Sequence, residues 1–225
     1  MNKRFLPGAL LASSLALAAC GGSRPDQHVL FFLGDGMGIP VQTAARIYAR
    51  GEEGSLTMDS LPENGFIRTY SNDAMVTDSA ASMTAYMSGV KTNNDVIGMD
   101  AASLYKSASG TRVATFGEIA KKAGWGVGVV TTTRVTHATP AAVYAHTTDR
   151  DLEEDIAAQL VRGNASYNAA LGDGLDVIFG GGTTQFNKRK DSADLLAALK
   201  GNGYSVATDR KGFDAISGKG RAIAL

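Results

Sequence analysis

Apolar runs separated by polar and glycine-rich breaks extend along most of the chain. The continuous runs at 28–33 and 126–131 are typical of buried strands, the first covered on both faces. The run at 174–179 predicts a further strand that leads into three glycines. The segment 65–70 is rich in aromatic and β-branched residues and also favours a strand. Another short apolar run lies just before Leu225. The pattern therefore predicts several short strands spread along the sequence.

Segments of helical character lie between these runs. They span residues 41–50, 80–87, 115–123, 140–146, 151–162 and 193–200. Pro40 suits the first turn of a helix, and Gly89 and Gly124 suit helix ends. Because strands alternate with helices, we expect an α/β fold with a largely parallel central sheet flanked by helices.

The N-terminal residues 1–19 have the pattern of a targeting segment, with two basic residues followed by an apolar stretch. That stretch is too short and too rich in alanine for a permanent membrane span. It ends in Leu-Ala-Ala-Cys, which resembles a bacterial lipoprotein signal that is cleaved before a lipidated Cys20. We therefore expect a signal peptide at 1–19, a tether at 20–27, a domain at 28–225, and a location in the periplasm or at the cell surface. A plain secretory signal with an incidental cysteine is the alternative.

Composition narrows the chemistry that this domain can support. Lys and Arg together number 22, as do Asp and Glu, so charge gives no indication of nucleic-acid binding. Cys20 is the only cysteine, which excludes an intrachain disulfide and a site built from several thiolates. A metal site in this chain must use carboxylate, hydroxyl, imidazole and water ligands.

Asp35 is the first candidate functional residue. It lies in a glycine-rich break, 34–38, directly after an apolar run, and ligand sites in open α/β sheets lie beyond the carboxyl ends of strands. A carboxylate between glycines can approach a metal without crowding. Asp35 can also be an ordinary turn residue. A dinucleotide-binding loop fits poorly, because Ile39 stands where the third glycine of that motif would be.

Ser79 and Asp78 stand where the second predicted helix begins. Free backbone N–H groups and the helix dipole favour negative charge there, which suits both phosphate and a serine alkoxide. The Gly-x-Ser-x-Gly pattern is absent around Ser79, so metal activation is the better explanation for a nucleophile. The alternative is an ordinary helix cap.

His137, Thr139 and Arg150 form the third group, beyond the run 126–131. The threonine hydroxyl suits a hard cation such as Mg²⁺, and the guanidinium can bind two phosphate oxygens. Taken singly, these residues can equally be a surface histidine, a capping threonine and a solvated arginine. His146 lies within a predicted helix and is interpreted as structural.

Together, the segments 30–38, 76–81, 89–92, 137–150 and 176–182 resemble the alkaline phosphatase family in order and spacing. The resemblance covers roughly residues 28–204. It implies a metal-dependent phosphomonoesterase in its bacterial lipoprotein form, acting on phosphate monoesters. The rival sulfatase and phosphoglycerate mutase families share the general architecture, but the sulfatase signature is missing at Ser79.

The resemblance implies a role for each candidate residue. Ser79 would be the nucleophile that forms a phosphoserine, and Arg150 would hold the phosphoryl oxygens with Asp78 orienting it. Zn²⁺ and Mg²⁺ would be the cofactors, and Asp35 would bridge a zinc ion and the magnesium ion.

The metal site would also include Ser79, Thr139 and His137. Thr139 would be a magnesium ligand. His137 stands where family members carry either Asp or His. With His, the resemblance implies a site less suited to magnesium and more to zinc, because imidazole suits zinc better than magnesium.

The sequence also departs from the family. The remaining zinc ligands of the family, and a Glu of the magnesium site, lie in its C-terminal half, and this chain has only three His. We therefore expect an N-terminal part of such an enzyme that is inactive, or nearly so, on its own. A non-catalytic phosphate-binding lipoprotein or a truncated remnant is the alternative. Family members are often dimers, so a homodimer is compatible with the resemblance.

Overall fold

The computed structural model describes residues 27–225, in two units that divide after Gly34. In the first unit, residues 27–34 form neither helix nor strand, and the apolar side chains at 29–33 are exposed. The predicted buried strand at 28–33 is therefore wrong for this structure. An apolar run indicates a tendency to be buried, but it does not specify the neighbouring strand that a backbone ladder requires. The signal-peptide prediction and Cys20 lie outside the described residues.

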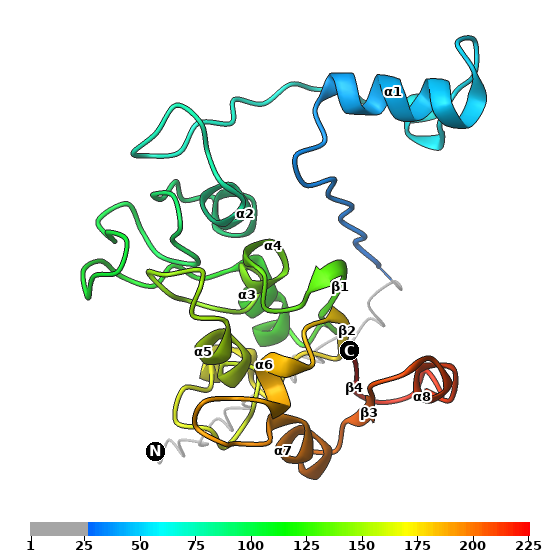
Figure 1. Ribbon diagram of the computed structural model, residues 1–225. Coiled ribbons are helices and arrows are strands. Elements are labelled where there is room, and N and C mark those ends of the chain that lie inside the picture. The colour runs from blue at the N-terminus through cyan, green and yellow to red at the C-terminus, as the bar shows by residue number, and fades with distance from the viewer. Residues whose placement is uncertain (1–26) are drawn as a thin grey trace, which may run out of the picture. The chain divides into compact units, whose positions relative to one another are not determined.

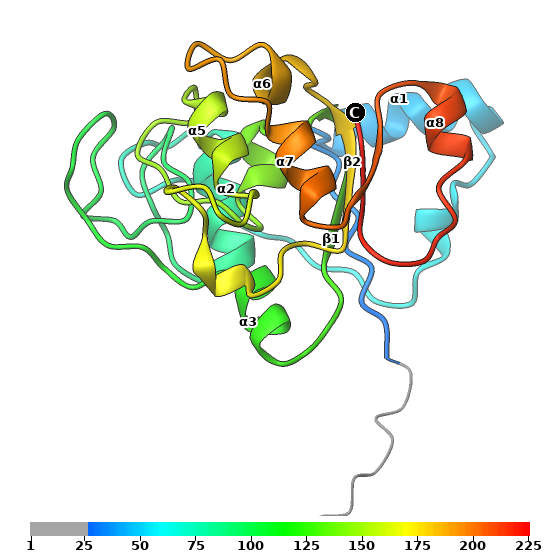
Figure 2. The same ribbon diagram turned by 90° about the horizontal axis from the view of Figure 1, so that it is seen from below.

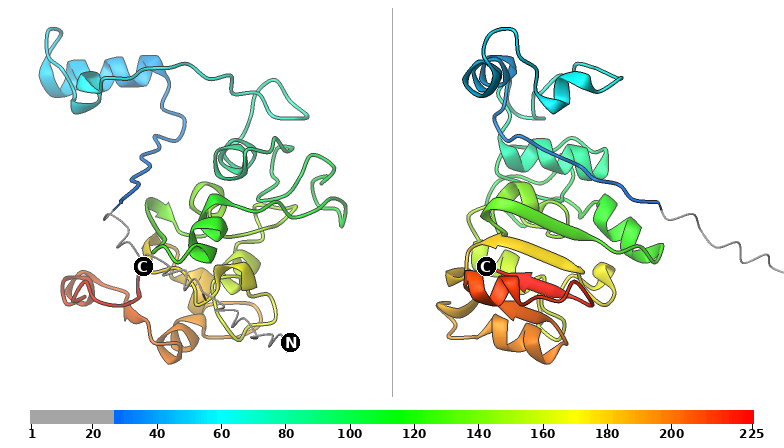
Figure 3. Two further views of the ribbon diagram at one scale, coloured as in Figure 1. Left: turned by 180° about the vertical axis from the view of Figure 1, so that it is seen from behind. Right: turned by 90° about the vertical axis from the view of Figure 1, so that its right-hand side faces the viewer.

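The second unit, 35–225, contains a four-stranded parallel sheet. Its strands are β1 (Gly128–Arg134), β2 (Val177–Gly181), β3 (Ser205–Ala207) and β4 (Ala222–Ala224), in the order β1-β2-β4-β3. The right-hand view of Figure 3 shows them side by side, from β1 in green to β3 in orange. The prediction of a largely parallel sheet is confirmed, and so is the short strand just before Leu225.

Helices pack on both faces of the sheet in this unit (Figures 1 and 2). Their bounds are α1 (Ile39–Arg50), α2 (Ser79–Ser88), α3 (Phe116–Lys122), α4 (Ala138–Ala141), α5 (Glu153–Ala158), α6 (Thr184–Asn187), α7 (Leu195–Gly201) and α8 (Arg210–Asp214), with 3₁₀ turns η1 (Thr57–Ser60) and η2 (Ala169–Leu171). In Figure 2, α2, α3, α5, α6 and α7 lie on one side of the strands and α8 on the other. Among the described residues, no helix is both long and apolar enough to cross a membrane.

The two faces of the sheet follow from the alternation of side chains along each strand. Val129, Ile178 and Ile223 are aligned across three strands and are buried in the core beneath the helices. On the other face, Phe179 makes an edge-to-face contact with Phe213 of α8, with ring centroids 5.3 Å apart. This face is covered only in part.

The prediction that the segment 126–131 is a buried strand is therefore wrong for one of its two faces. β1 is an edge strand, and Val130, which follows the buried Val129, is 75% exposed. The run of small and β-branched residues correctly located the strand. It did not reveal that helices cover only one face of it.

Local sequence signals account for the helices that were predicted well. Pro40 lies in the first turn of α1, and Gly89 ends α2 in the left-handed conformation at φ 70°. Thr115 caps α3 in a reciprocal capping box with Glu118, and Gly124 follows at φ 79°. The helices predicted at 140–146 and 151–162 are shorter, and they are α4 and α5.

Other predictions of secondary structure were wrong or missing. Residues 65–70 form no strand, and Phe66 is 94% exposed. Aromatic and β-branched content favours a strand only where a neighbouring strand and a packing surface exist. The short elements β3 and α8 were not predicted, because three to five residues give too few positions to define a period.

A buried polar network links α3 to the segment that leads to Arg150. His146 Nε2 lies 2.7 Å from Glu118 Oε1, and His146 Nδ1 lies 2.6 Å from the carbonyl oxygen of Gly98. Asn168 also donates to Glu118 Oε1, at 2.6 Å. Both ring nitrogens of His146 therefore face oxygen atoms, one of a carboxylate and one of a backbone carbonyl. The structural role predicted for His146 agrees with this geometry.

Candidate active site

Ser79 is the first residue of α2, and its hydroxyl does not cap the helix. The cap is Asp78, whose Oδ1 accepts the backbone N–H of Ala81 at 2.9 Å. The Ser79 hydroxyl instead contacts the carboxylate of Asp35, at 3.1 Å from Oδ1 and 3.0 Å from Oδ2. The capping alternative therefore applies to Asp78, and the hydroxyl of Ser79 remains available for chemistry at the N-terminus of a ten-residue helix.

Asp35 brings together two hydroxyl groups that are far apart in the sequence. Its turn is formed with Gly36 at φ 66°, a conformation that glycine adopts without strain. Thr139 Oγ1 donates to Asp35 Oδ2 at 2.8 Å, and the Ser79 hydroxyl contacts the same carboxylate. Oxygen atoms from one carboxylate and two hydroxyls therefore converge at one point, which is the donor chemistry that a hard cation prefers.

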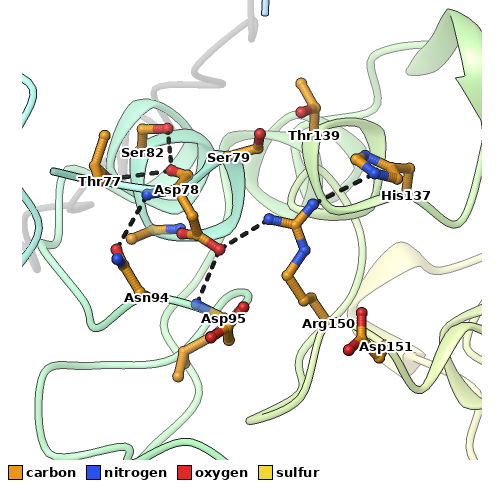
Figure 4. Close-up of polar contacts among 12 residues, drawn as sticks. Thr77, Asp78, Ser79, Ser82, Asn94, Asp95, His137, Thr139, Arg150 and Asp151 are labelled. Carbon is orange, nitrogen blue, oxygen red and sulfur yellow. Dashed lines mark hydrogen bonds and ion pairs between the residues drawn. The ribbon is translucent and has the colours of Figure 1, made fainter. Parts of the chain in front are cut away.

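Arg150 lies between Asp78 and His137 (Figure 4). Its Nη1 donates to Asp78 Oδ2 at 2.8 Å, and its Nη2 lies 3.4 Å from His137 Nε2. Its backbone N–H donates to the carbonyl oxygen of Asp95 at 2.9 Å. The guanidinium is thereby held by the residue that directly precedes Ser79, so the cation and the hydroxyl belong to one site.

His137 is half-buried at the N-terminus of α4. Its Nδ1 is buried and has no hydrogen-bond partner among the described residues. Burial lowers the pKa of His137, and the positive charges of Arg150 and Arg134 lower it further. A neutral imidazole with an unused buried nitrogen is compatible with a metal ligand.

Acidic side chains surround Arg150, including two that the sequence did not single out. Asp95 and Asp151 lie beside it in Figure 4. Burial and the nearby carboxylate of Asp78 raise the pKa of Asp95, while Arg150 opposes that shift. The guanidinium therefore partly offsets the negative charge around it before any phosphate arrives.

A second ion pair, also missed in the sequence, lies next to His137. Glu153 accepts hydrogen bonds from Arg134 Nε at 2.8 Å and from Thr136 Oγ1 at 2.6 Å. Burial raises the pKa of Glu153, but the hydrogen bonds from Arg134 and Thr136 hold it below its usual value. No local motif marks this pair, since its members lie on a strand and a helix nineteen residues apart.

The residues present fit part of a metal site. Asp35, Ser79 and Thr139 supply convergent oxygen atoms, and His137 supplies a buried nitrogen. Within residues 27–225, however, no three His, Cys, Asp or Glu side chains gather closely enough to hold a metal ion. Zinc usually needs about three protein ligands even at a catalytic site. The oxygen donors suit a hard cation, whereas the described residues do not complete a zinc site.

Comparison with known proteins identifies the class of protein that this fold and site define. The family model described as alkaline phosphatase matches residues 26–221. Alkaline phosphatase from Gadus morhua is 39% identical over 202 residues, covering 76% of this chain and 42% of that protein. Alkaline phosphatase 4 from Drosophila melanogaster is 44% identical over 202 residues, covering 81% and 33%. The chain therefore belongs to the alkaline phosphatase family.

Solved structures lead to the same family. A mutant of the alkaline phosphatase from the Antarctic bacterium TAB5, with Mg bound, matches with a TM-score of 0.70 and 35% identity. The match covers 85% of this chain and 50% of that one. The present chain thus spans between a third and a half of the length of these three relatives.

Proposed function

We propose that this chain carries the nucleophile and the phosphate-binding arginine of a metal-dependent phosphomonoesterase. The observation that supports this most is the placement of Ser79. Its hydroxyl lies at the N-terminus of α2 against the carboxylate of Asp35, and Arg150 is paired with the preceding residue, Asp78. Substrates would be phosphate monoesters, as expected for the family.

In the proposed reaction, the Ser79 oxygen attacks phosphorus while the bond from phosphorus to the ester oxygen breaks. The N–H groups at the start of α2 and the guanidinium of Arg150 face the phosphoryl oxygens and offset their charge. Water then cleaves the phosphoserine and releases inorganic phosphate. The Ser79 proton points toward Asp35 in the resting site.

We further propose Mg²⁺ and Zn²⁺ as the cofactors. Asp35, Ser79, Thr139 and His137 would be the ligands that this chain contributes. When bound, the metals would activate the serine oxygen and stabilise the charge of the leaving oxygen. Magnesium bound in a histidine-to-glutamate mutant of the TAB5 alkaline phosphatase supports magnesium as one of the two cofactors.

Metal-dependent release of alcohol from a chromogenic phosphate monoester tests this function. With zinc and magnesium added, we expect slow turnover by the 225-residue chain that a chelator abolishes. The rate is expected to be low because the described residues supply an incomplete ligand set. The same incomplete set supports the alternative of a phosphate-binding protein without turnover. Saturable phosphate binding with no alcohol released would establish that alternative.

Replacing Arg150 with alanine should weaken phosphate binding. Hydrogen bonds to charged groups contribute about 1.5–3 kcal/mol, so we expect the dissociation constant for inorganic phosphate to rise by roughly 10- to 150-fold. Isothermal titration calorimetry measures this directly. Arg210→Ala is the control, because Arg210 is exposed and forms an ion pair with Asp214, four residues further along the chain. Unchanged affinity in R150A would remove Arg150 from the binding site.

We also propose that the protein is a lipoprotein of the periplasm or cell surface, anchored through Cys20. The support is the sequence pattern of residues 1–20 alone. Cells fed radioactive palmitate should label the wild-type protein, and Cys20→Ser should remove the label because no other thiol exists in the chain. Equal labelling of both proteins, or fractionation of the wild type with cytoplasm, would contradict the proposal.

Homodimer formation is part of the same proposal. It is supported by the family resemblance and not by any contact within the chain. Light scattering of the purified chain gives its mass in solution, and a monomer at all concentrations tested would reject a dimer of this chain.

A further inference from the structure

Asn94 lies in the loop after α2 and bonds to the segment that leads into that helix. Its side-chain Oδ1 accepts the backbone N–H of Asp78 at 3.1 Å, and its Nδ2 donates to the carbonyl oxygen of Val76 at 3.0 Å. Its own backbone N–H donates to Asp73 Oδ1 at 2.9 Å. One amide side chain therefore fixes the backbone on both sides of residue 77, just before Ser79 (Figure 4).

Asp78 connects this loop to the candidate active site. Each of its carboxylate oxygens is committed: Oδ1 accepts from Ala81 N at 2.9 Å, and Oδ2 accepts from Asp95 N at 2.9 Å and from Arg150 Nη1 at 2.8 Å. A carboxylate held at three points has little freedom to turn. Its direction depends on the backbone at Asp78, whose N–H is bonded to Asn94.

Asp95, which follows Asn94, contacts both Asp78 and Arg150 through its backbone. Asp95 adopts the left-handed conformation at φ 66°, which Asp and Asn tolerate better than most residues. Its N–H reaches Asp78 and its carbonyl oxygen accepts the N–H of Arg150 at 2.9 Å. The turn at Asn94 and Asp95 thus spans the serine segment and the arginine segment.

We infer that Asn94 is a positioning residue, which acts through Asp78 to fix Arg150 relative to Ser79. The inference rests on the proposed roles of Ser79 and Arg150. The site requires an acceptor for the Asp78 N–H and a donor for the Val76 carbonyl, and an amide supplies both. Aspartate would keep the acceptor, but it would lose the donor and place a third carboxylate beside Asp73 and Asp78.

The adjacent Asn93 provides a matched control. It is 3% exposed, its Nδ2 donates to the carbonyl oxygens of Ala101 and Ser103, and its Oδ1 accepts from Asn72 Nδ2 at 2.7 Å. These side-chain hydrogen bonds go to residues other than Val76 and Asp78, which Asn94 holds. Asn93→Ala should therefore disturb the fold at least as much as Asn94→Ala. It should leave the contacts of Asp78 in place.

Amide hydrogen exchange at Ala81 and the NMR signal of the Arg150 side chain report the geometry without any turnover. In the 225-residue chain, we expect N94A to speed exchange of the Ala81 N–H by about fivefold, the loss of roughly one hydrogen bond, and to shift the Arg150 Nε–H signal. N94D should give an intermediate change, because it retains the acceptor. N93A should change neither readout.

Two results would overturn the inference. The first is that neither readout changes in N94A. The second is that N93A changes both readouts as much as N94A does, which would mean that Asn94 only stabilises the fold. These outcomes are separate from the proposed function. If the readouts move as expected while Ser79 never carries a phosphoryl group, the positioning role stands and the proposed function fails.

Discussion

Substitution of Ser79 by alanine should abolish the slow metal-dependent ester hydrolysis expected of this chain, leaving only the background rate measured without protein. Loss of a nucleophile removes the covalent path altogether, and enzymes that lose one fall toward the residual level supplied by binding and charge stabilisation. Phosphate binding should persist, since Arg150 and its contact to Asp78 do not depend on the serine hydroxyl. Initial rates with a chromogenic ester measure the effect.

Ser88→Ala is the matched control for this substitution. Ser88 ends the same helix, and its hydroxyl donates to the carbonyl oxygen of Thr84 rather than to Asp35. Both variants lose one hydroxyl from α2, so a difference between them isolates the chemistry at Ser79. Hydrolysis by S79A at the rate of S88A would show that another group attacks phosphorus.

The second large effect is expected on stability, at Glu118. Glu118→Gln replaces the buried carboxylate that bonds to His146, Asn168 and the Thr115 N–H, and a hydrogen bond to a charged group contributes about 1.5–3 kcal/mol. Urea unfolding of wild type, E118Q, H146Q and the double variant measures the pair, because the cycle removes effects that each substitution has alone. An additive double variant would mean that Glu118 and His146 are not coupled.

The pH dependence of this effect has a definite sign. Burial raises the pKa of Glu118, but hydrogen bonds from His146, Asn168 and the Thr115 N–H hold it below its ordinary value of 4.5. A carboxyl whose pKa is lower in the folded state stabilises the fold above its unfolded pKa and loses that contribution as pH falls. The stability difference between wild type and E118Q should therefore shrink as pH falls below about 4.5. A constant difference from pH 6 to pH 3 would contradict this.

Much of the helical structure could be predicted because its signals are local. Pro40, Gly89 and the capping box of Thr115 and Glu118 each act within one turn of a helix, so a short stretch of sequence contains the full cause. The strand at 177–181 was located by its apolar run.

The errors arose where structure depends on distant partners. The runs at 28–33 and 65–70 have the composition of strands but form no strand in this structure. Val130 is exposed because β1 lies at the edge of the sheet, and strand order is not visible in an apolar run. Periodicity reports which residues tend to be buried, while the neighbours that bury them lie elsewhere in the chain.

In the candidate site, too, local sequence identified single residues but not the distant partners that they contact. Ser79 and Asp35 are 44 residues apart, and Thr139 lies 104 residues from Asp35. Local chemistry identified each as a candidate, but only the family resemblance joined them before the structure placed them together. Asn94 was missed, because an asparagine in a polar loop has no signature until its partners are known.

The central claim is that Ser79 accepts a phosphoryl group. Incubation of the chain with a phosphate monoester, zinc and magnesium, followed by acid quench and peptide mass mapping, tests it most directly. The account predicts a mass increase of one phosphoryl group on the peptide that contains Ser79, with fragmentation placing it on that residue and none appearing in S79A. A chain that binds phosphate yet remains unmodified, or that carries the group on another hydroxyl such as Thr139, would contradict it.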